Sequence, residues 1–206
     1  MRIHAVYGRL LRPFRRRRMR RFAASFGELS RLRVIDVGGS AFNWRLLASA
    51  PRLVLVNLAV PPAGGETVAG AAFVVGDGTR LGFADGAFDV AFSNSVIEHL
   101  GTPERQLAFA RELRRVARGL WVQTPARSFP FEPHLLAPCV HWLPRGVQRR
   151  LLRRFTPWGW LARPSPERVE RHLVETRLLS GREIRRERFC GLTKAWVAVR
   201  RPGALR

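Results

Sequence analysis

The apolar residues at the start of the chain recur at helical spacing. They follow one another at intervals of three and one, which places them on one side of a helix: Ile3, Val6, Tyr7, Leu10, Leu11 and Phe14. We expect Pro13 to kink or end this helix, because proline lacks the backbone N–H that a helix interior needs. A run of arginines follows, from Arg15 to Arg21. The pattern predicts a basic amphipathic helical segment over residues 1–28, ahead of one domain over residues 29–206.

Short apolar runs, each ended by glycine or polar residues, then mark five strands. The runs cover residues 32–37, 53–58, 73–75, 88–92 and 120–123. Helices are predicted from about Phe42 to Ser49 and from Thr102 to Gly119, the second with threonine as N-cap and proline at the first helical position. Strands that alternate with helices predict an α/β fold with a doubly wound, mostly parallel sheet.

The pattern changes after the fifth strand. Residues 124–165 are rich in proline and tryptophan, too apolar for a linker, and we predict a lid over the carboxyl edge of the sheet. A helix is predicted over residues 166–179. A closing pair of strands is predicted at residues 189–190 and 195–199, with residues 191–194 as the turn between them.

Charge is distributed unevenly along the chain. The formal net charge is +22, of which the first 33 residues carry +10 and residues 111–206 carry +15, whereas residues 34–110 carry −3. Nearly all the basic residues are arginine, which suits phosphate or carboxylate recognition but also a coding bias applied to a solvated surface. Two cysteines predict neither a disulfide framework nor a structural zinc site. We therefore expect a cytoplasmic protein, with peripheral attachment to the inner face of a membrane as an open alternative.

Polar residues and glycines stand at the ends of four predicted strands. In an open parallel sheet, ligands bind outside the carboxyl ends of the strands. Each residue also has a local explanation, since Asp36 could cap the next helix, Asp77 could form an Asx turn and Asn57 could simply end a strand. Occurring in this order, they predict a site for a nucleoside-type cofactor formed by Asp36, Gly38, Gly39, Ser40, Asn57, Asp77, Gly78, Ser93 and Asn94.

Two of these stretches resemble a known family. The stretch from Val34 to Ser40 is similar to the first motif of class I S-adenosylmethionine-dependent methyltransferases. The stretch from Gly76 to Leu100 resembles the UbiE-like small-molecule branch, methyltransferase type 11. The resemblance covers about residues 30–200. It implies a Rossmann-like sheet of order 3-2-1-4-5 plus a closing antiparallel pair, with S-adenosylmethionine as cofactor.

The resemblance also implies roles for matching positions. Gly38 would let the backbone approach the methionine part of the cofactor, and Asp36 would orient this loop. Asp77, beside Gly78, would read the adenine amine, and Ser93 would lie near the methyl-donor end. The chain departs from the family at Ser40, Phe42 and Asn57, where two glycines and an acid are usual.

The methyl acceptor is less well defined by the sequence. The resemblance implies a small-molecule, lipid-linked or glycan-linked acceptor. His99 is the candidate general base, and Glu132 and His134 in the lid are candidates for acceptor contact. No metal is expected.

Two alternatives remain open for the arginines. The N-terminal helix could lie on an anionic membrane surface. The arginines near residues 149–154 and Trp158 could serve an RNA-binding protein or RNA methyltransferase. Nucleic acid is the less favoured partner, because no RNA-binding module is recognisable.

Overall fold

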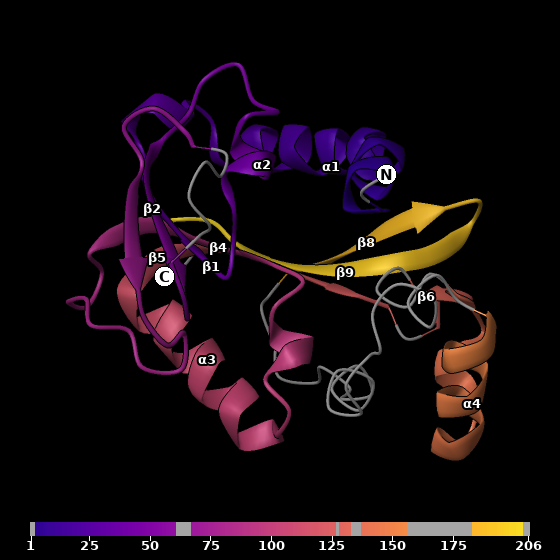
Figure 1. The fold of residues 1–206 in the computed structure, drawn as a ribbon. Helices are drawn as coiled ribbons and strands as arrows, with labels where there is room; N and C mark the ends of the chain where they lie inside the picture. Colours follow the sequence, from indigo (N-terminus) through magenta and orange to yellow (C-terminus); the bar gives the residue numbers. More distant parts are fainter. Residues whose placement is uncertain (1–2, 61–66, 127, 133–136, 156–182, 204–206) are drawn as a thin grey trace.

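A seven-stranded sheet forms the centre of the protein (Figure 1). The structure, a computed structural model, describes residues 3–60, 67–126, 128–132, 137–155 and 183–203. A two-stranded ribbon and several helices surround the sheet. In chain order the elements are α1 (Ile3–Phe26), η1 (Leu29–Arg31), β1 (Arg33–Val37), α2 (Ala41–Trp44), β2 (Arg52–Asn57), β3 (Ala72–Val75), β4 (Phe88–Asn94), η2 (Ile97–His99), α3 (Pro103–Val116), β5 (Ala117–Pro125), β6 (Phe131–Glu132), β7 (Ala137–Pro138), η3 (Val140–Trp142), α4 (Arg145–Phe155), β8 (Glu183–Phe189) and β9 (Leu192–Arg200).

The strand order is β3-β2-β1-β4-β5-β9-β8. Strands β1 to β5 are parallel, and β9 is antiparallel to both β5 and β8. The prediction of a Rossmann-like, doubly wound sheet with a closing antiparallel pair is therefore confirmed. Because β1 and β4 are neighbours at the point where the strand order reverses, their carboxyl ends open onto one crevice.

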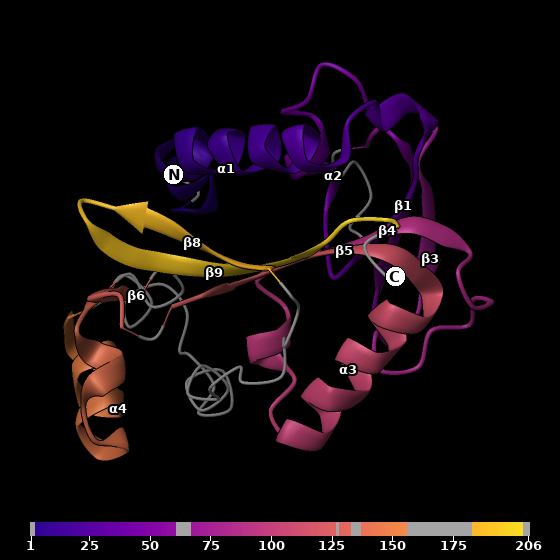
Figure 2. The ribbon, with the colours of Figure 1, turned by 180° about the vertical axis from the view of Figure 1, so that it is seen from behind.

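Helices cover the two faces of the sheet unequally. Helix α1 lies across one face with α2, and α3 lies on the opposite face (Figures 1 and 2). Helix α3 begins as predicted, with the Thr102 hydroxyl accepting a hydrogen bond from the Arg105 backbone N–H and Pro103 at the first position. Its apolar side packs on the sheet around Phe109 and Leu113, both fully buried.

Helix α1 runs from Ile3 to Phe26, within the helical segment predicted over residues 1–28. It continues past Pro13, so of the two outcomes expected at this proline, a kink or an end, the end is wrong. Its second half is held by the core, where Met19 and Phe22 are buried. Phe22 makes edge-to-face contacts with Trp44, Phe92 and Trp121, with ring centroids 5.2–5.7 Å apart. Tertiary packing of this kind outweighs the backbone hydrogen bond that a proline removes.

Two other predicted helix boundaries also differ. Helix α2 ends at Trp44 instead of about Ser49. Helix α3 ends at Val116 and passes directly into β5, so Gly119 lies within the strand. A Cβ at Gly119 would lie 2.9 Å from Pro202 Cδ and 3.0 Å from the Asp89 carbonyl oxygen. The glycine is thus needed for a close approach of two chain segments and does not end the helix.

The closing hairpin has a tighter turn than expected. Cys190 and Gly191 both have positive φ, 48° and 79°, which suits a two-residue connection between twisted strands. The predicted turn over residues 191–194 is therefore wrong, and Leu192 to Lys194 belong to β9. Both cysteines are free and exposed. The predicted helix over residues 166–179 lies outside the described residues.

The loop between β3 and β4 is fixed by one arginine of α3. Arg115 donates hydrogen bonds to the carbonyl oxygens of Leu81 and Phe83, at 2.8 and 2.7 Å. It also pairs with Asp85 and with Glu112, whose carboxylate accepts the Leu81 backbone N–H at 2.6 Å. Much of the family-like block after Asp77 therefore serves to hold this loop on α3.

The predicted lid is partly described. Within residues 124–165, β5 continues to Pro125, and the β6–β7 ribbon, η3 and α4 follow beyond the end of the sheet (Figure 1). Residues 156–165 lie outside the described part. None of the described helices is long and apolar enough to cross a membrane.

Candidate functional site

The loop after β1 is shaped by two glycines. Gly38 has a φ of 79°, and its N–H donates to the Val56 carbonyl oxygen at 2.7 Å. A Cβ on Gly38 would overlap Val96, and a Cβ on Gly39 would overlap the carboxylate of Asp36. The backbone therefore passes directly over the end of β1, which no larger residue at either position would allow.

Asp36 is buried beneath this loop with no exposed surface. Its Oδ2 accepts a hydrogen bond from Trp44 Nε1 at 2.8 Å. Its Oδ1 has no hydrogen-bond partner among the described residues. Burial raises the pKa of Asp36 to about 7, and the bond from Trp44 offsets only part of this rise. Near neutral pH the loop thus rests on a carboxyl group that is close to its midpoint of ionisation.

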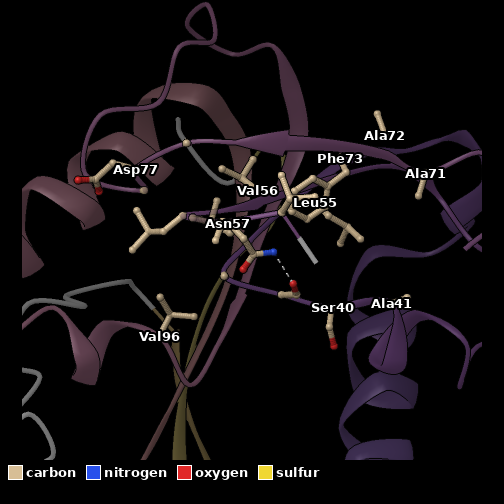
Figure 3. A pocket seen from close by; sticks show the side chains of 18 of the residues that line it. Ser40, Ala41, Leu55, Val56, Asn57, Ala71, Ala72, Phe73, Asp77 and Val96 are labelled. Atoms are coloured by element: carbon tan, nitrogen blue, oxygen red, sulfur yellow. Dashed lines mark hydrogen bonds between the residues drawn. The ribbon is translucent and has the colours of Figure 1, made fainter. Parts of the chain in front are cut away.

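Asn57 holds the same loop from the end of β2. Its Nδ2 donates to the Gly39 carbonyl oxygen at 2.8 Å, the bond drawn in Figure 3. An amide supplies both this donor and an acceptor oxygen, whereas the acid usual at this position would supply acceptors only. The departure from the family therefore gives the loop a direct tether to β2.

Asp77 lies after β3. It faces Ser40 across the cavity drawn in Figure 3. Its Oδ1 accepts from the Thr79 backbone N–H and hydroxyl, both at 2.8 Å, so the predicted Asx-type turn is present. Its Oδ2 is 3.3 Å from Arg105 Nη2. The Thr79 backbone N–H lowers the pKa of Asp77, and Arg105 adds to this effect. Asp77 is therefore ionised at neutral pH, with one oxygen on a long, exposed contact.

These groups surround a cavity of about 650 Å³. Its walls are mainly apolar, with Val56, Phe73 and Val96 among them (Figure 3). Such a volume and lining are typical of small-molecule and cofactor sites. Of the predicted cofactor residues, those that line this cavity are Gly38, Gly39, Ser40, Asn57, Asp77 and Gly78.

A second cavity of about 290 Å³ shares the loop after β1 with the first. Both are lined by Gly38, Gly39 and Ser40. The second extends past the ends of β4 and β5 towards α1 and β9. Its remaining lining residues are Phe14, Arg15, Arg18, Asn43, Asn94, Ser95, Gln123, Pro125, Lys194 and Ala195.

Of the residues around the end of β4, Ser93 has a structural role, whereas Asn94 and Ser95 line the smaller cavity. Ser93 is fully buried and donates from its hydroxyl to the Val37 carbonyl oxygen at 3.0 Å, so it ties β4 to β1 and lines neither cavity. Asn94 lines the smaller cavity, and its Oδ1 accepts from Arg18 Nη1 at 2.6 Å. Ser95 has a φ of 57° and donates to Gln123 Oε1 at 3.1 Å.

The three candidates for catalysis are not brought together in the described residues. His99 lies in η2, partly buried, and lines neither cavity. Glu132 belongs to β6, where only its backbone is described. His134 lies outside the described residues. Within the part of the chain that the structure describes, no group of three or more His, Cys, Asp or Glu could hold a metal ion.

No sequence pattern marked Arg15, Arg18 or Lys194 as site residues. They reach the smaller cavity from α1 and β9, at opposite ends of the chain, and no local motif connects them. One signal was present, since Lys194 is the only lysine among 37 basic residues.

Comparison with known proteins supports the family resemblance. A family model described as a methyltransferase domain matches residues 39–119. No curated protein matches the chain significantly. The matched segment begins at Gly39, in the loop after β1, and contains Asn57, Asp77 and all of β4.

Solved structures similar to this chain are distant in sequence. They include a putative methyltransferase from an antibiotic biosynthesis pathway of Anabaena variabilis, with 17% identity, 68% of this chain and 60% of that chain covered, and a TM-score of 0.47. Another is a Burkholderia thailandensis 1,6-didemethyltoxoflavin-N1-methyltransferase, with 17% identity, 58% and 54% covered, and a TM-score of 0.44. A third is a SAM-dependent methyltransferase from Methanosarcina mazei, with 16% identity, 48% and 55% covered, and a TM-score of 0.41.

The chain spans between 54% and 60% of the length of these three structures. The family model covers residues 39–119, and this segment of the chain matches a methyltransferase domain.

Proposed function

We propose that the chain binds S-adenosylmethionine in the larger cavity and transfers its methyl group to a small-molecule, lipid-linked or glycan-linked acceptor. The observation that carries the proposal is the gathering of the ends of β1, β2 and β3 around one cavity. The groups at these ends are Gly38, Asn57 and Asp77, in the order expected for a nucleoside cofactor.

The site fits such a cofactor in three respects. Gly38 and Gly39 let the loop after β1 pack directly on Val96 and Asp36, so that the backbone surface of this loop lines the cavity. Asp36 Oδ1 lacks a hydrogen-bond donor among the described residues, directly beneath that surface. The apolar wall near Phe73 suits an adenine ring, with Asp77 Oδ2 as an acceptor for its amine and Asn57 as the partner of a ribose hydroxyl.

The chemistry requires little from the protein. When bound, the cofactor supplies a methyl group that is already activated by its sulfonium sulfur. The residues of this chain align the acceptor, exclude water and, where the acceptor must lose a proton, provide a base. We retain His99, Glu132 and His134 as candidates for contact with the acceptor, and Ser93 as a residue that positions β4.

Substitution of Asp77 tests the cofactor site. Asp77→Ala removes the acceptor for the adenine amine and the turn that presents it, so we expect binding of S-adenosylhomocysteine to fall below detection in calorimetry. Asp85→Ala is a matched control, because Asp85 is exposed and lines neither cavity. We expect this control to bind within about twofold of wild type. Absence of binding heat with the intact protein would contradict the cofactor assignment.

Attachment to an anionic membrane is a second proposal, favoured by the outer side of α1. Arg12, Arg16, Arg17 and Arg20 are exposed there, whereas Met19 on the other side is buried in the core. This half of the helix therefore offers charge without a free apolar face.

A vesicle assay tests this attachment. We expect phosphatidylserine vesicles to bind the protein, and glutamine at these four arginines to weaken binding about a thousandfold, since each contributes about 1 kcal/mol and the four together about 4 kcal/mol. Phosphatidylcholine vesicles are the control. Equal binding of wild type and variant would remove the proposal, and steeply salt-dependent RNA binding instead would favour the RNA alternative.

A further inference from the structure

The smaller cavity has an unusual balance of charge. Its lining contains three basic residues, Arg15, Arg18 and Lys194, and no acidic residue among those described. Hydrogen-bonding side chains complete the wall, among them Asn94 and Gln123. A partly enclosed space with this lining favours a negatively charged group over a neutral or positive one.

Arg18 is occupied by contacts within the protein. Its Nε and Nη2 bind the carboxylate of Glu187 on β8, at 2.6–3.1 Å, and its Nη1 binds Asn94. Both members of this ion pair are nearly buried, with side chains 11% and 13% exposed. Arg18 therefore fixes α1 against the sheet and orients Asn94, and the charge of Glu187 is already balanced.

Lys194 is the basic residue left without such a partner. Within the described part of the chain it forms no ion pair, and its Nζ lies 3.5 Å from the centre of the Phe14 ring. The ring stabilises the ammonium but cannot neutralise it. Burial lowers the pKa of Lys194 and the charge of Arg18 lowers it further, whereas the charge of Glu187 offsets part of this decrease. An anion beside Lys194 would further stabilise the charged form of the lysine.

The position of Lys194 places this charge next to the proposed reaction centre. Its backbone carbonyl oxygen accepts from Ala126 N–H at 2.9 Å, which anchors β9 beside the end of β5. The same cavity is bounded by Gly38 to Ser40, the loop that also lines the proposed cofactor cavity. Arg15 reaches it from α1 and stacks on Phe42, with its Cζ 4.9 Å from the ring centre.

We infer that the smaller cavity is an oxyanion site, in which Lys194 and Arg15 bind a carboxylate or phosphate group of the methyl acceptor. This assignment of the anion to the acceptor rests on the proposed function. The oxyanion site itself does not, because it depends only on the lining of the cavity. The acceptor would thus be an anionic small molecule or a phosphate-linked lipid or glycan.

The single lysine of the chain allows a direct test. Protein grown with lysine labelled with ¹³C at the ε carbon gives one lysine side-chain NMR signal, that of Lys194. We expect titration with inorganic phosphate, at constant ionic strength, to shift this signal saturably and to raise the pKa of Lys194. The same shift is expected with S-adenosylhomocysteine at saturation.

Variants separate this site from the general basic surface. Arg15→Met should weaken phosphate binding about tenfold. Arg31→Met, at an exposed residue paired only locally with Glu28, should leave it unchanged. Lys194→Arg should retain phosphate binding measured by calorimetry and Lys194→Met should lose it, while both keep their affinity for S-adenosylhomocysteine.

Each contrary result has a separate meaning. A signal that does not respond to phosphate, or that responds equally in both arginine variants, overturns the oxyanion site. Loss of the phosphate response on adding S-adenosylhomocysteine overturns the acceptor assignment, because the anion position would then hold the carboxylate of the cofactor. Failure of S-adenosylhomocysteine to bind, with the phosphate response intact, would instead count against the proposed function.

Discussion

Asp36→Asn is expected to stabilise the protein relative to wild type by about 3 kcal/mol more at pH 8 than at pH 5. The reason is the complete burial of Asp36, which raises its pKa from 3.8 to about 7. Between pH 3.8 and about 7, Asp36 holds a proton in the folded protein that it releases in the unfolded chain. The contribution of Asp36 to the free energy of unfolding is therefore highest below pH 3.8, falls as pH rises, and levels off above about pH 7. The full change is about 4 kcal/mol.

The asparagine variant removes this dependence without removing the contact. Its amide oxygen can still accept the hydrogen bond from Trp44 Nε1, but it cannot ionise. Chemical unfolding at pH 5, 6, 7 and 8 measures the difference between the two proteins. Asp85→Asn, at an exposed carboxyl group, is the control and should run parallel to wild type. A constant difference between Asp36→Asn and wild type across the series would show that Asp36 does not titrate in this range.

Phe22→Ala is expected to reduce the free energy of unfolding by about 4 kcal/mol. Phe22 has no exposed surface and contacts four other aromatic rings, those of Phe26, Trp44, Phe92 and Trp121. Truncation would leave a cavity bounded by rigid rings from α2, β4 and β5, which cannot collapse easily. The expected loss is a large share of the total stability of a typical domain.

Phe73→Ala provides the comparison for Phe22. Phe73 lies on the edge strand β3 and is 36% exposed, so its truncation should cost about 1 kcal/mol. Urea unfolding followed by tryptophan fluorescence measures both variants. Equal losses for the two would mean that α1 is not part of the cooperative core. That result would favour the boundary after residue 28 as a true division of the chain.

The burial of Met19 and Phe22 explains why sequence patterns described α1 incompletely. The apolar stripe up to Phe14 was visible because its spacing is regular. Met19 and Phe22 were hidden within a run of arginines, where a basic solvated segment was the natural interpretation. Their burial depends on Trp121, a residue one hundred positions away in sequence, whose ring completes the aromatic cluster.

The candidate site was predicted with uneven success for a related reason. Gly38, Asn57 and Asp77 were found because each follows a strand, and parallel strands bring their carboxyl ends to one edge. Ser93 satisfied the same rule but points to the Val37 carbonyl oxygen, a choice made by side-chain direction and not by position in the chain. Lys194 was missed because its place in the hairpin was misread as a turn.

The sequence by itself determined the α/β class, the order of the strands through family resemblance, and the line of polar residues along the carboxyl edge of the sheet. These features depend on local periodicity and on rules of connection between neighbouring elements, which a linear pattern contains. Only the tertiary structure decided that Asp36 is fully buried and accepts a hydrogen bond from Trp44, and that Arg15 and Lys194 line one cavity. Burial and charge at a site are sums over residues distant in sequence, so they exist only once the chain has folded.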